Sequence, residues 1–209
     1  MTPSDKIRVF SVDDHPLLRE GLGTIINAQS DMSLVAAVSN GREAIETFRR
    51  LRPDITLMDL QLPDSSGIDV ITAIRTEFSD VRIIVLTTYE RDVEIQRALK
   101  AGARGYLLKS MAADRMVETI RTVHGGKKSI PPEIAAGLVE HLVDEPLSNR
   151  EVEVLRHVAA GNRNRDIAEK LFIAEETVKV HLKHIMGKLS ASDRTQSVAI
   201  AARRGIINI

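Results

Sequence analysis

Three carboxylates, a hydroxyl and an ammonium group lie at the ends of short apolar runs within the first 109 residues of the chain. The five residues are Asp13, Asp14, Asp59, Thr87 and Lys109. Carboxylates that crowd into one crevice cannot all stay ionised without a cation nearby. Oxygen donors without His or Cys favour a hard divalent ion, Mg²⁺ best. A carboxylate neutralised in this way can attack phosphorus and form an aspartyl phosphate.

Lys109 and Thr87 fit the same chemistry, because phosphoryl transfer depends on charge neutralisation and positioning more than on acid–base catalysis. Lys109 can bind one phosphoryl oxygen, and Thr87 can donate a hydrogen bond to another. A second interpretation stays open for the acidic pair, since Asp14 before His15 and Pro16 also fits the N-cap of a helix. A phosphoryl-transfer site therefore requires that all these strand ends meet at one edge.

The elements that must position these residues are five βα units. The sequence predicts strands at 6–12, 33–39, 54–59, 81–87 and 104–109, and helices at 16–29, 41–51, 67–78, 91–102 and 112–126. Strands that read as unbroken apolar runs belong to a parallel sheet covered on both faces. Right-handed crossovers then lead to an α/β, doubly wound five-stranded sheet. In such folds the active crevice lies at the carboxyl ends of the strands, where all five residues are found.

The stretches VDDHP, LMDLQLPDSSG, VLTTY and GYLLKS resemble, in order and spacing, the receiver domain of bacterial two-component response regulators. The resemblance implies a flavodoxin-like receiver domain over residues 1–126, with Asp59 as the phosphoacceptor. It also implies that Mg²⁺ is bound by Asp14, Asp59 and the backbone carbonyl of Gln61, with Asp13 acting through water.

The same resemblance assigns Thr87 as the hydroxyl that follows the phosphoryl group and Tyr106 as the aromatic whose rotamer reports it. Lys109 is then the lysine of the family motif. From the residues alone, Tyr106 also fits a half-buried strand aromatic, and Thr88 lies one register step from Thr87. Ser110 stands where many receivers have proline, which leaves the geometry of the Lys109–Ser110 peptide open.

Composition and charge divide the 209 residues into parts with different duties. There is no cysteine, which excludes disulfides and thiol chemistry, and no apolar run long enough for a membrane span. We therefore expect a cytoplasmic protein that does not enter the membrane. Residues 1–128 carry no net charge, residues 129–147 carry four acidic and no basic residues, and residues 148–209 carry 11 basic against 7 acidic. Residues 127–146 are expected to be a linker with a short helix at 133–142.

From residue 147 to 209 the pattern is helical throughout. Ser148 and Glu151 have the spacing of a capping box, and Asn164 fits a helix cap. A helix at 175–189 buries one apolar stripe, while Lys179 and Lys183 lie on its opposite side. A short helix, a turn at 172–174 and a helix with a basic face are typical of a helix-turn-helix, although a solvated basic face alone gives the same pattern.

Residues 147–207 resemble the LuxR-type helix-turn-helix of the NarL/FixJ response regulators. The resemblance implies that base edges are contacted by Lys179, Val180 and Lys183, and phosphates by Asn164, Arg165, Thr177 and Lys188. This chain departs from its relatives at Ala174, where a capping Ser or Thr is usual, and at Glu176, which adds a negative charge near the DNA phosphates.

Together the two resemblances imply a DNA-binding transcriptional response regulator that is not an enzyme. Its expected partners are double-stranded DNA, a sensor histidine kinase and a second copy of itself when it is phosphorylated. One alternative is a phosphorylation-independent DNA-binding regulator that uses the receiver as a dimerisation platform. A phosphoryl-transfer enzyme is the other alternative, and residues 147–207 argue against it.

Overall fold

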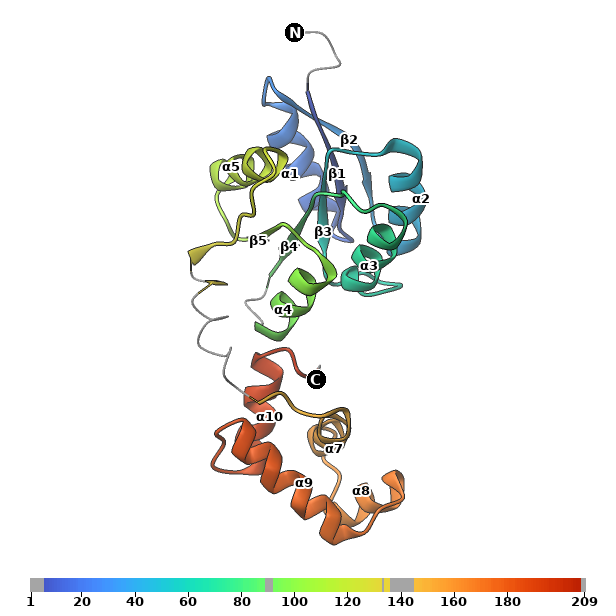
Figure 1. The fold of residues 1–209 in the computed structure, drawn as a ribbon, viewed down its shortest axis with the longest axis vertical. Helices are drawn as coiled ribbons and strands as arrows, with labels where there is room; N and C mark the ends of the chain where they lie inside the picture. Colours follow the sequence, from blue (N-terminus) through green and yellow to red (C-terminus); the bar gives the residue numbers. More distant parts are fainter. Residues whose placement is uncertain (1–5, 89–91, 133, 136–144, 208–209) are drawn as a thin grey trace. The chain divides into compact units, whose positions relative to one another are not determined.

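The computed structural model describes residues 6–88, 92–132, 134–135 and 145–207 (Figure 1). The chain divides into two compact units, one formed by residues 1–90 and 95–135 and the other by residues 91–94 and 136–209. The helix predicted at 133–142 falls mostly outside the described residues. Among the described helices, none is long and apolar enough to cross a membrane.

The first unit contains a five-stranded parallel sheet with the order β2-β1-β3-β4-β5, which confirms the predicted fold class. Its strands are β1 (Ile7–Val12), β2 (Met32–Val38), β3 (Ile55–Asp59), β4 (Ile83–Thr87) and β5 (Gly105–Leu108). Along the chain these strands alternate with the helices α1 (Pro16–Asn27), α2 (Gly41–Leu51), α3 (Gly67–Glu77), α4 (Asp92–Ala101, with residues 95–101 in the first unit) and α5 (Ala113–His124).

The central strands are buried because helices cover both faces of the sheet. Figure 1 shows α1 and α5 on one face and α2, α3 and α4 on the other. Every residue of β3 and β4 is buried, which explains why both read as unbroken apolar runs. In the register of the sheet, Asp59 pairs with Leu86 and Thr87 pairs with Leu108. Asp59, Thr87 and Lys109, which stand at the ends of β3, β4 and β5, therefore lie at the same edge of the sheet.

The second unit is helical, with α7 (Asn149–Ala159), α8 (Asn164–Leu171), α9 (Glu175–Lys188) and α10 (Arg194–Arg203) around one apolar core. The predicted capping box is present, because the Glu151 N–H donates to Ser148 Oγ at 3.3 Å and the Ser148 N–H donates to Glu151 Oε2 at 2.7 Å. The prediction that Asn164 caps α8 is wrong. Arg163 holds the N-cap position, and its N–H donates to the carboxylate of Asp166 at 3.0 Å.

Candidate functional site

Four side chains gather at the carboxyl ends of β1 and β3. Asp13 and Asp59 are almost completely buried, whereas Asp14 and His15 are exposed at the surface. One ligand atom from each of the four lies within 4.8 Å of all the others. The acidic residues meet as the sequence predicts, and His15 is a neighbour that the motif alone did not identify.

Lys109 reaches into this group from the end of β5. Its Nζ lies 2.7 Å from Asp59 Oδ2, in a hydrogen bond, and 2.7 Å from Asp13 Oδ2, in an ion pair without hydrogen-bond geometry. The lysine side chain is only 10% exposed. A buried ammonium group therefore bridges the two buried carboxylates.

Burial and pairing act in opposite directions on these groups. Burial raises the pKa of Asp59 above its usual value, although the hydrogen bond from Lys109 lowers it in part. Burial also lowers the pKa of Lys109, but the carboxylates of Asp13 and Asp59 outweigh that effect and leave the pKa of the lysine raised. Lys109 consequently remains a full positive charge at neutral pH.

His15 contacts both members of the acidic pair and precedes the first residue of α1. Its N–H donates to Asp13 Oδ1 at 2.8 Å, and its Nδ1 lies 2.7 Å from Asp14 Oδ1 and 3.2 Å from Asp13 Oδ1. His15 holds the N-cap position of α1, and no side chain caps that helix. The alternative in which Asp14 serves as the helix cap is therefore not what the structure shows.

The turn after β3 fixes the position of Asp59. The Gln61 N–H donates to Asp59 Oδ1 at 3.2 Å, and the Gly67 N–H donates to Leu60 O at 2.9 Å. A Cβ atom at position 67 would lie 2.0 Å from the backbone oxygen of Asp59. Only glycine fits this close approach, which gives a physical reason for the glycine in the LPDSSG stretch.

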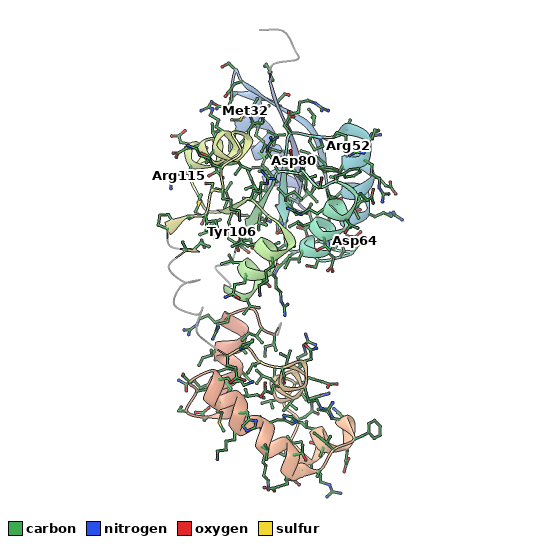
Figure 2. All side chains as sticks on the ribbon, viewed as in Figure 1. Met32, Arg52, Asp64, Asp80, Tyr106 and Arg115 are labelled. Atoms are coloured by element: carbon green, nitrogen blue, oxygen red, sulfur yellow. The ribbon has the colours of Figure 1, made fainter. Side chains whose placement is uncertain are left out.

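The structure separates the possibilities that the sequence left open at the ends of β4 and β5. Thr87 is buried and Thr88 is exposed, so Thr87 is the residue that faces the interior. Tyr106, labelled in Figure 2, is completely buried rather than half-buried. The Lys109–Ser110 peptide is trans, as are all described peptide bonds, and the Lys109 N–H donates to Thr87 O at 2.7 Å.

In the second unit, α9 presents the residues that were predicted to meet base edges. Lys179, Val180 and Lys183 are exposed, while Val178 and Leu182 are buried in the core. Lys179 Nζ lies 3.0 Å from Glu176 Oε2, and this hydrogen bond raises the pKa of the lysine. Glu176 therefore holds Lys179 in an ion pair on the surface of α9.

Of the four residues predicted to contact phosphates, two are exposed and two are partly buried. Thr177 and Arg165 are exposed, although Arg165 also pairs with Glu169 at 3.2 Å. Asn164 is partly buried at the first residue of α8, with its Oδ1 inside the unit. Lys188 is also partly buried, with 18% of its side chain exposed.

Lys188 connects the start of the second unit to α9. Its Nζ lies 3.0 Å from Glu151 Oε2 and 3.0 Å from Glu145 Oε1, and it donates to Pro146 O at 3.3 Å. Burial raises the pKa of Glu151, but the Ser148 N–H and Lys188 together outweigh it, so that pKa is lowered. This pairing holds Lys188 within its own unit, and no local pattern predicts a contact across 37 residues.

Comparison with known proteins gives two family matches and full-length relatives. Residues 9–121 match the response regulator receiver domain, and residues 145–201 match the bacterial regulatory proteins of the luxR family. The transcriptional regulatory protein YxjL of Bacillus subtilis (strain 168) is 39% identical, over 97% of this chain and 98% of its own length. The transcriptional regulatory protein LiaR of the same organism is 36% identical, over 97% of this chain and 100% of its own length.

A solved structure shares both units of this chain. RcsB from Salmonella enterica serovar Typhimurium, bound to the promoter P1flhDC in the presence of the phosphomimetic BeF₃⁻, is 26% identical with a TM-score of 0.73. The match covers 95% of this chain and 98% of the RcsB chain.

Proposed function

This chain belongs to the NarL/FixJ family of two-component response regulators, which are DNA-binding transcription factors, and we propose that Asp59 is the residue in it that accepts the phosphoryl group. The observation that carries this proposal is the position of Asp59. It is buried at the end of β3 with an ammonium nitrogen 2.7 Å from one oxygen and a backbone N–H 3.2 Å from the other. These two donors orient the carboxylate and favour its ionised form, which is the nucleophile.

The residues around Asp59 fit a divalent cation. Asp13, Asp14 and Asp59 offer hard carboxylate oxygens within a few ångströms of one another, and Asp14 is open to solvent. We propose that Asp14, Asp59 and the Gln61 carbonyl hold Mg²⁺, with Asp13 acting through water. When bound, the ion neutralises charge on the carboxylates and on the incoming phosphoryl group.

The proposed donor is a phosphohistidine of a sensor histidine kinase. An oxygen of Asp59 attacks phosphorus, the new O–P bond forms, and the bond to the donor's imidazole nitrogen breaks, with the electron pair staying on that nitrogen. Lys109 then exchanges its contact with the Asp59 carboxylate for one with a phosphoryl oxygen. The Thr87 hydroxyl donates a hydrogen bond to a second phosphoryl oxygen, and Tyr106 changes its position as Thr87 moves.

The output is DNA binding by α9. We propose that Lys179, Val180 and Lys183 contact base edges, that Arg165 and Thr177 contact phosphates, and that two phosphorylated copies bind paired half-sites. RcsB, a relative with the same two units, has been captured on promoter DNA. We assign the protein to the cytoplasm, where kinase and DNA are both accessible.

The test is a DNA-binding titration at fixed salt concentration, with and without a small phosphodonor and Mg²⁺. The native protein should bind more tightly after phosphorylation, and an Asp59→Ala variant should show neither labelling nor the gain in affinity. Label that persists in the variant would refute the assignment of Asp59. Equal affinity of labelled and unlabelled native protein would instead support a regulator that does not depend on phosphorylation.

A further inference from the structure

The chain turns back after α5 and runs along the free edge of the sheet. Residues 127–132, which we name the strap, follow the turn at Gly125 and Gly126 (Figure 1). Ser129 forms a parallel bridge with Gly105 of β5. The Ser129 N–H donates to Arg104 O at 3.0 Å, and the Tyr106 N–H donates to Ser129 O at 3.0 Å. The strap thus extends the sheet beyond β5 by a single residue.

Side chains fix the strap to the first unit as well. Ser129 Oγ lies 3.4 Å from Thr119 Oγ1 on α5, and Pro131 is buried. The Ala135 N–H donates to Pro131 O at 2.9 Å, and Ile134 is only 2% exposed. The strap is therefore docked on the first unit rather than free in solution.

One of the two backbone hydrogen bonds at Ser129 comes from Tyr106, the residue proposed above as the switch. The proposed switch side chain is buried inside the unit, while the N–H of the same residue holds the strap. The strap is also the first part of the only covalent path from the receiver to the DNA-binding helices. A movement of the Tyr106 backbone would consequently change the first hydrogen bonds of the linker.

We propose that the strap is a built-in coupling device, which the receiver holds in the resting state and releases when Asp59 is phosphorylated. The inference rests on the proposed function, because it takes phosphorylation of Asp59 as the trigger. When Tyr106 repositions, its N–H leaves Ser129 O, and the linker gains freedom at its first residues. The bridge involves one residue and two hydrogen bonds, so a modest shift of β5 is sufficient to break it.

Amide hydrogen exchange of the full chain, measured by NMR with and without beryllofluoride and Mg²⁺, tests this directly. The Tyr106 and Ser129 amides should exchange faster by roughly 5- to 150-fold in the activated protein, the range typical of coupling between sites. The Thr56 amide, bonded to Arg82 O at 3.0 Å inside the sheet, should keep its rate and serves as the control. A strap that only covers the edge of β5 would stay protected in both states, and that result would overturn the proposal.

Variants at position 129 separate the backbone pairing from the side chain. Ser129→Pro removes the N–H that donates to Arg104 O, whereas Ser129→Ala keeps both backbone bonds and removes only the hydroxyl. The Pro variant should exchange its Tyr106 amide quickly without beryllofluoride and should lose most of the increase in DNA affinity on phosphorylation. The Ala variant should behave as the native protein does.

Two outcomes distinguish this proposal from the proposed function. If the native chain takes up no phosphoryl group at Asp59, the proposed function fails and the strap loses its trigger. If Asp59 is labelled and DNA affinity rises, but Ser129→Pro keeps the native increase despite a fast-exchanging Tyr106 amide, only the strap proposal fails. A Pro variant that does not fold, seen as a fast Thr56 amide, leaves the decision to the exchange measurement on the native chain.

Discussion

Replacing Lys109 with Met should destabilise the first unit strongly in the absence of Mg²⁺. Lys109 Nζ lies 2.7 Å from an oxygen of Asp59 and 2.7 Å from an oxygen of Asp13, and both carboxylates are buried. At an effective dielectric constant of about 20, each contact corresponds to about 6 kcal/mol of Coulomb attraction. The cost of desolvating the three groups offsets most of this.

The measurable loss is the cost of leaving two buried carboxylates without a cation. Removing one partner of a buried ion pair typically costs about 3–5 kcal/mol, against a total stability of about 5–15 kcal/mol for a domain. The Met side chain fills most of the volume of the lysine stem, so the loss should reflect the charge rather than a cavity. We expect about 3 kcal/mol or more at pH 7.5.

The assay is urea unfolding of the full chain in EDTA, followed by far-ultraviolet circular dichroism. The same substitution at an exposed lysine, Lys128→Met, serves as the matched control and should change the free energy of unfolding by less than about 0.5 kcal/mol. Adding Asp59→Asn to Lys109→Met should recover part of the loss, because one uncompensated charge disappears. A loss below about 1 kcal/mol for Lys109→Met, or no recovery in the double variant, would refute the claim that Lys109 neutralises this pocket.

Three further predictions follow from contacts in the two units. Gly67→Ala should cost at least about 1–3 kcal/mol of stability through the clash with the Asp59 backbone, whereas Gly21→Ala, with open space around its Cβ, should be neutral or stabilising; thermal unfolding compares them. Lys183→Ala should weaken DNA binding and lower the slope of log affinity against log salt concentration by about one, without affecting stability. Lys188→Ala should mainly destabilise the helical unit, because it leaves Glu151 without its cation. DNA binding at several salt concentrations and thermal unfolding compare the two variants, and equal behaviour would contradict this prediction. Folding lowers the pKa of Glu151, so its contribution to stability is present above its unfolded pKa and is lost as the pH falls through its folded pKa. The Glu151→Gln variant should not show this loss when its stability is followed into acid. Identical stability–pH profiles for the variant and the native chain would contradict the prediction.

The sequence predicted the receiver pocket well because a parallel sheet brings its strand ends together without help from local detail. Once the apolar runs before Asp59 and Lys109 are taken as strands, their convergence is a property of the fold. The glycine at position 67 lies in the quoted stretch LMDLQLPDSSG, and the structure gives a reason for it, a backbone approach that no side chain allows.

Contacts between distant segments could not be predicted in the same way. Lys188 was predicted to contact phosphate, yet its side chain is only 18% exposed and is paired with Glu151, 37 residues earlier in the chain. Asn164 is a good cap by type, but Asp166 reaches back to the Arg163 N–H and moves the cap by one residue. Residues 127–132 have no strand pattern in the sequence, because a bridge of one residue needs none, yet this bridge pairs them with β5 of the first unit.

The measurement that bears most directly on the whole account is the location of a phosphoryl group on the native chain. The protein is incubated with acetyl phosphate and Mg²⁺, the acyl phosphate is trapped by borohydride reduction, and the modified peptide is sequenced by mass spectrometry. The account predicts one modified residue, Asp59, and no modification when Mg²⁺ is removed with EDTA. Modification of Asp13, Asp14 or any other residue in place of Asp59 would contradict it.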